Sequence, residues 1–165
     1  MTVFSLAEAN ALIPELRRLI SRAQAELGSA YDELKSANDA LLNQEWQLRQ
    51  ARIDGITGDT DTETLQRQWQ IAADHLTGEK ETFGDLRETW VHAIHDRGVL
   101  LRDLQRGLVD FPALLGEAEF FYCWVVNEDE ITHWHSRKEG FTNRKPLDAL
   151  HSWDGEPASE ESTED

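Results

Sequence analysis

Residues 16–48 read LRRLISRAQAELGSAYDELKSANDALLNQEWQL, and apolar side chains recur through this stretch in alternating steps of four and three residues. Gln44 is the one polar member of the series. The series consists of Leu16, Ile20, Ala23, Leu27, Ala30, Leu34, Ala37, Leu41, Gln44 and Leu48. A 3.5-residue repeat of this kind is typical of a helix that packs against another helix along its length. The stretch therefore predicts a long coiled-coil helix.

A second series with the same spacing runs from Leu65 to Arg97. Its members are Leu65, Trp69, Ala72, Leu76, Glu79, Phe83, Leu86, Trp90, Ala93 and Arg97. Residues 53–60 separate the two series, contain two glycines and lack periodicity, which predicts a turn. If the helices are antiparallel and facing residue numbers add up to 113, five of the ten layers pair an alanine with a larger side chain. Such pairing keeps the interhelical spacing constant, so we expect a helical hairpin over residues 5–97.

Capping patterns mark the ends of these helices. Ser5 and Glu8 have the spacing of a capping box, and Thr60 and Glu63 repeat it before the second helix. Gly98 stands where the second helix is expected to stop. Pro14 predicts either a kink or a restart of the first helix.

The apolar period shortens toward two after residue 98, which predicts four short strands at 99–104, 108–111, 119–126 and 130–135. Turns are expected at 105–107, 112–118 and 127–129. Residues 120–126 are apolar on both faces, which favours a central strand covered on both sides. The predicted fold class is α+β, mostly α: one domain over residues 1–153, with the hairpin at 5–97 and a small antiparallel β-sheet cap with a loop at 98–150.

The chain is strongly acidic, with a formal net charge of −16. This charge disfavours duplex nucleic acid as a partner. Residues 154–165 carry six acids and no base, and this composition predicts a disordered acidic tail. No apolar run approaches the roughly 18–20 residues that span a membrane, and the single cysteine, Cys123, cannot form an intramolecular disulfide. We therefore expect a cytoplasmic protein that binds neither nucleic acid nor membrane.

Several strings in the sequence carry a resemblance to a known family. They are Glu8–Pro14 (EANALIP), residues 103–112 (DLQRGLVDFP), Cys123-Trp124, Trp134-His135, Gly140-Phe141 and Arg144. Through them the chain from Phe4 to about Pro146 resembles the uncharacterised prokaryotic family known as domain of unknown function 2203. Residues 127–131 read NEDEI where that family has GEPEI, which leaves the local turn type open. The resemblance implies a fold and no assigned activity.

His133 and His135 are the clearest candidate metal ligands, because residues i and i+2 of a strand point to the same face. A three-residue turn at 127–129 would set Cys123 opposite His133 and create a Cys-His-His set with a fourth position open, as expected for zinc with water or a substrate. A two-residue turn would place Tyr122 and Trp124 beside the histidines instead. The alternative to a metal site is a pair of half-buried, hydrogen-bonded structural histidines.

Two further groups of polar residues are candidates for chemistry or binding. Asp103 and Asp110 could act as an acid–base pair, or they could cap turns and pair with Arg102 or Arg106. Residues 137–145 hold four bases and one acid, so an anionic ligand or partner is expected to contact this segment. The residues expected to bind it are Arg137, Lys138, Phe141 and Arg144. The alternatives are that the segment binds the chain's own acidic tail or that it is a solvated loop.

A sparser apolar stripe lies outside the first series and consists of Tyr31, Leu42, Trp46 and Ile53. It is either a set of scattered surface side chains or the interface of a homodimer, which we favour. The expected function is a non-enzymatic, cytoplasmic binding or scaffolding protein that dimerises through the hairpin and presents the cap to a ligand or partner. The alternative is a small zinc-type metal-dependent protein, such as a hydrolase, with its site at Cys123, His133 and His135. No catalytic residues are predicted.

Overall fold

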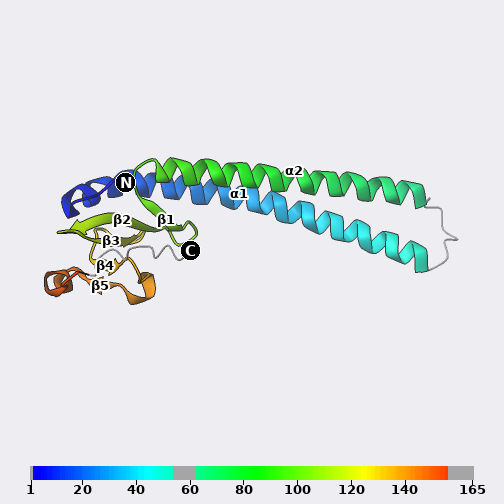
Figure 1. Cartoon of the computed structure of the whole chain (residues 1–165). Coiled ribbons are helices and arrows are strands. Elements are labelled where there is room, and N and C mark those ends of the chain that lie inside the picture. Colours follow the sequence, from blue (N-terminus) through cyan, green and yellow to red (C-terminus); the bar gives the residue numbers. More distant parts are fainter. Residues whose placement is uncertain (1, 54–61, 156–165) are drawn as a thin grey trace, which may run out of the picture. The chain divides into compact units, whose positions relative to one another are not determined.

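The structure, a computed structural model, describes residues 2–53 and 62–155. Figure 1 shows two long helices followed by an antiparallel sheet, which confirms the predicted α+β, mostly helical fold class. The elements in chain order are α1 (Leu6–Ile53), α2 (Thr62–His95), β1 (Leu100–Asp103), β2 (Leu108–Leu115), β3 (Ala118–Val125), β4 (His133–Ser136), the 3₁₀ helix η1 (Phe141–Asn143), β5 (Lys145–Pro146) and the 3₁₀ helix η2 (Leu147–Ser152). Most of the expected interhelical turn, the capping residue Thr60 and nearly all of the expected acidic tail lie outside the described residues.

The chain divides into two compact units. The first comprises residues 1–24 and 90–165, and so combines the sheet with the beginning of α1 and the end of α2. The second comprises residues 25–89, whose described residues belong to the rest of α1 and α2. No helix in the described part of the chain is both long enough and apolar enough to cross a membrane.

Every position of the two apolar series is buried or half-buried, as a helix–helix seam requires. Three side-chain contacts report how the helices are aligned. They join Glu15 to Arg97, Arg22 to Trp90, and Tyr31 to Phe83. The residue numbers of each pair add up to 112 or 114, within one of the predicted 113, so the contacts agree with the predicted antiparallel register.

The helix ends follow local hydrogen bonding. The Ser5 backbone N–H donates to Oε2 of Glu8 at 2.8 Å, and the Glu8 N–H donates back to Oγ of Ser5 at 3.2 Å, which confirms the first capping box. Helix α1 runs through Pro14 without a restart. Helix α2 ends at His95, and Gly98 adopts a left-handed φ of 82° while its N–H donates to the His95 carbonyl at 2.8 Å.

The five strands form an antiparallel meander in the order β1-β2-β3-β4-β5. The prediction of a turn at 112–118 was wrong, because β2 continues through Pro112 to Leu115 and only two residues separate it from β3. The Pro112 carbonyl accepts a hydrogen bond from the Phe4 N–H at 2.8 Å. The nitrogen of Pro112 therefore faces the side of β2 away from β3, beyond the end of β1, where a strand tolerates a missing N–H.

Two other boundaries differ from the prediction. Strand β4 begins at His133 rather than at residue 130, and residues 145–146 of the expected loop form the edge strand β5. The expectation for residues 120–126 is confirmed through residue 124, since Phe120 to Trp124 are buried whichever face of β3 they occupy.

The core of the first unit lies between the helices and one face of the sheet. Side chains from α1, α2 and alternate positions of the strands contribute to it. Its largest members are Leu16, Ile20, Ile94, Phe111, Phe120, Trp124 and Trp134. The opposite face of the sheet carries Asp110, Cys123 and His135, and these side chains are also buried.

Gly107 is expected to be indispensable in the β1–β2 turn. Its φ is +65°, and a Cβ atom there would lie 2.6 Å from the side chain of Val126. Gly107→Ala should therefore lower the free energy of unfolding by about 1–3 kcal/mol. A Cβ atom added at Gly28 within α1 would meet nothing within 4 Å, so Gly28→Ala should raise it by about 0.5–1 kcal/mol. Urea unfolding of both variants checks this, and equal effects would contradict the proposed turn geometry.

Candidate functional site

The strand register brings four chemically active side chains to one face of the sheet. Asp110 on β2 lies directly opposite Cys123 on β3, and Cys123 lies directly opposite His133 on β4. His135, two residues further along β4, is on the same face as His133. Cys123 therefore lies opposite His133, which is the register predicted for a three-residue turn at 127–129. The segment that joins β3 to β4 is longer than three residues.

Asp110, Cys123 and His135 form a compact buried group. One carboxylate oxygen, the thiol sulfur and one ring nitrogen all lie within 4.8 Å of one another. The residues are 2%, 0% and 3% exposed, respectively. Because oxygen, sulfur and imidazole nitrogen are all metal ligands, this group could hold a metal ion.

The group overlaps with the predicted ligand set but is not identical to it. Cys123 and His135 belong to it, and Asp110 takes the place expected for His133. His133 is half-buried, and its Nδ1 lies 2.8 Å from Oγ1 of Thr132. Asp110 was missed as a ligand because the turn before β3 was misplaced. A two-residue turn at Gly116-Glu117 would have paired Asp110 with Cys123 directly.

Hydrogen bonds orient Asp110 and His135. Nδ1 of His135 lies 2.9 Å from the Ser136 carbonyl, which can only accept, so this nitrogen carries a proton. Nε2 of His135 lies 3.0 Å from Oδ1 of Asp110. The other oxygen of Asp110 accepts a hydrogen bond from Nε of Arg102 at 2.8 Å. Asp110 therefore links a buried histidine to a half-exposed arginine, as the arginine alternative anticipated.

The protonation of His135 reflects a balance of two effects. Burial disfavours the charged ring and by itself lowers the pKa of His135. Hydrogen bonds to Asp110 and Cys123, the negative charge of Asp110 and the Ser136 carbonyl outweigh burial and raise the pKa of His135 to about 10. The ring is therefore a cation at neutral pH and forms a buried ion pair with Asp110.

This geometry does not match a nucleophilic Cys-His-Asp triad. In such a triad, one ring nitrogen faces the nucleophile and the other faces the acid. Here the Ser136 carbonyl occupies Nδ1, so Asp110 and Cys123 have only Nε2 to share. Cys123 is also completely buried, so it does not reach solvent from this position.

Asp103 lies apart from this group. Its Oδ1 accepts a hydrogen bond from the Arg106 backbone N–H at 3.0 Å, so it caps the β1–β2 turn. The acid–base pair considered from the sequence, Asp103 with Asp110, is therefore not assembled: the two carboxylates have separate partners.

The basic segment 137–145 makes ion pairs within the cap. Arg137 pairs with Glu119 at 2.9 Å, Arg144 with Glu128 at 2.8 Å and Lys145 with Glu139 at 3.1 Å. The guanidinium groups of Arg106 and Arg144 lie 4.5 Å and 4.4 Å from the ring centre of Phe141. Lys138 is exposed. Three of the basic side chains of this segment, which was expected to contact an external anion, thus pair with acidic side chains of the same chain.

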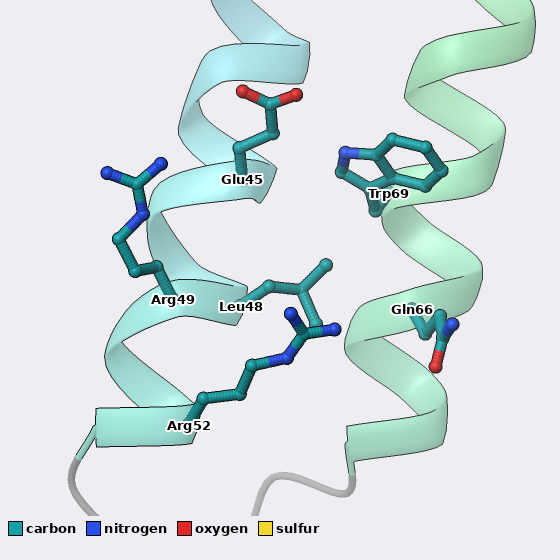
Figure 2. A pocket seen from close by; sticks show the side chains of 6 residues that line it. All are labelled: Glu45, Leu48, Arg49, Arg52, Gln66 and Trp69. Atoms are coloured by element: carbon teal, nitrogen blue, oxygen red, sulfur yellow. The ribbon is translucent and has the colours of Figure 1, made fainter.

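The predicted second stripe on α1 is exposed in the 25–89 unit. Tyr31, Leu42, Trp46 and Ile53 are 54–69% exposed. Near this stripe a hollow of about 480 Å³ lies between the helices, lined by Glu45, Leu48, Arg49, Arg52, Gln66 and Trp69. Figure 2 shows Leu48 and Trp69 pointing into the space between the helices, whereas Arg49 points away from α2. The surface here combines aromatic, aliphatic and charged side chains of both signs.

The buried ion pair predicts a specific pH dependence of stability. His135 has a pKa of about 10 when folded and roughly 6.5 when unfolded, so the folded chain binds the proton more tightly. Its stabilising contribution is complete below about pH 6.5 and is lost as the pH rises through 10. Urea unfolding in the presence of a chelator should show this decline for the unmodified protein. His135→Gln should lack it, and parallel pH profiles for the two proteins would contradict the assignment.

Comparison with known proteins agrees with the resemblance seen in the sequence. No curated protein and no solved structure matches the chain. One family model matches residues 2–147, which includes all three members of the buried group and both helices. The chain therefore belongs to the family described as Uncharacterized conserved protein (DUF2203).

Proposed function

We propose that this protein is a cytoplasmic binding or scaffolding protein without catalytic activity, which forms a homodimer through its hairpin and presents its cap to a ligand or partner. The observation that carries the proposal is the stripe of Tyr31, Leu42, Trp46 and Ile53, whose side chains are more than half exposed. Burying apolar surface contributes roughly 25 cal/mol per Å², so four large side chains supply a substantial driving force for association.

The spacing of the stripe suits a helix–helix interface. Residues 42, 46, 49 and 53 follow the steps of four and three that place side chains on one face of a helix. Arg49 lies between Trp46 and Ile53 on this face, and Glu45 lines the hollow beside it. A two-fold axis brings the same patch of each subunit together, so a patch with both charge signs can pair with itself. These features favour a second copy of the chain as the occupant.

The cap is the part of the dimer that we propose to meet a ligand or partner. Segment 137–145 supports this role through the exposed Lys138 and through Arg137, whose side chain is 63% exposed although it pairs with Glu119. Arginine can exchange a surface carboxylate for another carboxylate or a phosphate at little cost, because exposed ion pairs contribute little net stability. An acidic peptide or a small anion fits this chemistry.

Charged substitutions in the stripe should dissociate the dimer. We expect the double variant Leu42→Glu/Trp46→Glu to sediment as a monomer of about 18.9 kDa, because the interface would bury four like charges for each pair of subunits. The matched control is Ile71→Glu on α2, which replaces an equally exposed apolar side chain outside the stripe. Sedimentation velocity at one loading concentration compares the three proteins. If the double variant stays dimeric, the proposed interface is wrong.

The buried group favours a second candidate function, that of a small zinc-type metal-dependent protein. This candidate rests on the approach of Asp110, Cys123 and His135 to within 4.8 Å, a donor set of oxygen, sulfur and nitrogen that zinc accepts. If such a protein were an enzyme, it would be a hydrolase in which zinc activates a bound water.

The metal content of the protein tests the second candidate. After purification without an affinity tag and exhaustive dialysis, elemental analysis should find about one zinc per chain. The variant Cys123→Ser/His135→Gln should hold less than a tenth of that amount, because two of the three donors are lost. The exposed histidine of η2 provides a control, since His151→Gln should leave the zinc content unchanged. An absence of metal from the unmodified protein, even after zinc is supplied, would exclude the candidate.

A further inference from the structure

We infer that the cap metal is held in a closed site of four protein ligands, in which His133 joins Asp110, Cys123 and His135. In this site the metal cross-links strands β2, β3 and β4 and does not hydrolyse a substrate. The inference rests on the second candidate function, that a zinc-type metal binds in the cap. It goes beyond that proposal in two ways: it assigns His133 as the fourth ligand, and it gives the ion a structural role instead of a catalytic one.

The burial of the group favours a closed site. A catalytic zinc keeps one coordination position for water or substrate, whereas a structural zinc fills all four positions with protein atoms. The side chains of Asp110 and His135 are each 3% exposed, and Cys123 is 0% exposed. A metal bound among these atoms would lie beneath the surface of the sheet, where a substrate has no direct approach.

Hydrogen bonds to other atoms of Asp110 and His135 fix which atom of each residue would bind a metal. Nδ1 of His135 is held by the Ser136 carbonyl at 2.9 Å, which leaves Nε2 for a metal. Oδ2 of Asp110 is held by Arg102 at 2.8 Å, so its Oδ1 faces Nε2 of His135 at 3.0 Å. A metal bound here would take the place of the proton between these two atoms. Hydrogen bonds of this kind orient the ligands of zinc sites and fix the tautomer of a ligating histidine. The protein therefore already orients the Asp110 and His135 donor atoms toward each other, with the Cys123 sulfur within 4.8 Å of both.

His133 is placed to supply the fourth donor. It lies directly opposite Cys123 in the β3–β4 pairing and on the same face as His135. Directly opposed residues of antiparallel strands have Cβ atoms about 4.5–5.5 Å apart, which is within reach of an imidazole and a thiolate on one ion. The ring of His133 lies outside the 4.8 Å group, so binding requires its side chain to rotate. Its half-buried position allows that movement.

The charges of the four ligands also favour a closed site. A carboxylate and a thiolate together neutralise a divalent ion, and two neutral imidazoles complete a tetrahedral set. A neutral site is what a buried position requires, because an uncompensated buried charge is costly. With metal–ligand bonds of ~2.0–2.3 Å, ligand atoms on one zinc lie on the order of 3.5 Å apart. Nε2 of His135 and Oδ1 of Asp110, now 3.0 Å apart, would therefore separate slightly, and no two donor atoms of the group are more than 4.8 Å apart.

Cobalt(II) provides the test, because its absorption spectrum reports both coordination number and thiolate ligation. Full-length protein is treated with a chelator, dialysed and titrated with cobalt and then with zinc. The unmodified protein should give the intense visible bands of a four-coordinate site and a near-ultraviolet thiolate band. His133→Asn should bind zinc on the order of 100-fold more weakly. Mutating a residue that only hydrogen-bonds to a ligand typically costs about 10–100-fold in metal affinity, and loss of a ligand should cost at least as much. His151→Asn is the matched control and should bind like the unmodified protein.

Added azide distinguishes a closed site from an open one without relying on a variant. In the cobalt-loaded unmodified protein the spectrum should not change, because no position is available to azide. A spectral change on azide addition, or equal zinc affinity in His133→Asn, would overturn the closed four-ligand site while leaving metal binding intact. If neither cobalt nor zinc binds the unmodified protein, both the inference and the second candidate function fail.

Discussion

The pairing of β2 with β3 is the constraint on which the cap depends. A two-residue connection fixes the register and sets Asp110 against Cys123, and the next pairing carries the pattern on to β4. Because side chains alternate between faces, the same register sends large apolar residues toward the helices and polar residues to the other face. A shift of one residue would bury Asp110 in the apolar core and separate it from His135, so fold and site are specified together.

The polar face is unusual because a buried face normally carries apolar side chains. Asp110 satisfies one oxygen with Arg102 and the other with His135, and His135 satisfies its second nitrogen with the Ser136 carbonyl. Such a network is stable only when every member has a partner, because an unpaired buried charge is costly. The same network gathers three possible metal ligands within 4.8 Å of one another, so the group that forms the ion pair could also hold a metal ion.

The sequence predicted the hairpin well and the cap partly. Repetition explains the difference: many successive layers, from Leu16 to Leu48, report the same helical period, and an error at one position changes little. Strand register depends on single turns, and Pro112 suggested a turn where it occupies a tolerated strand position. That one error separated Asp110 from Cys123. Residues 137–145 gave no periodic signal, so their ion pairs with distant acids such as Glu119 could only be seen in the structure.

The proposed function depends on self-association of the unmodified chain, because the exposed stripe on α1 has no other proposed role. Sedimentation equilibrium over a hundredfold range of protein concentration measures self-association directly and requires no variant. A dimer of twice the 18.9 kDa chain mass is expected, with dissociation only at the lowest concentrations. A mass of one chain throughout the concentration range would contradict it, and would leave the stripe to a different partner.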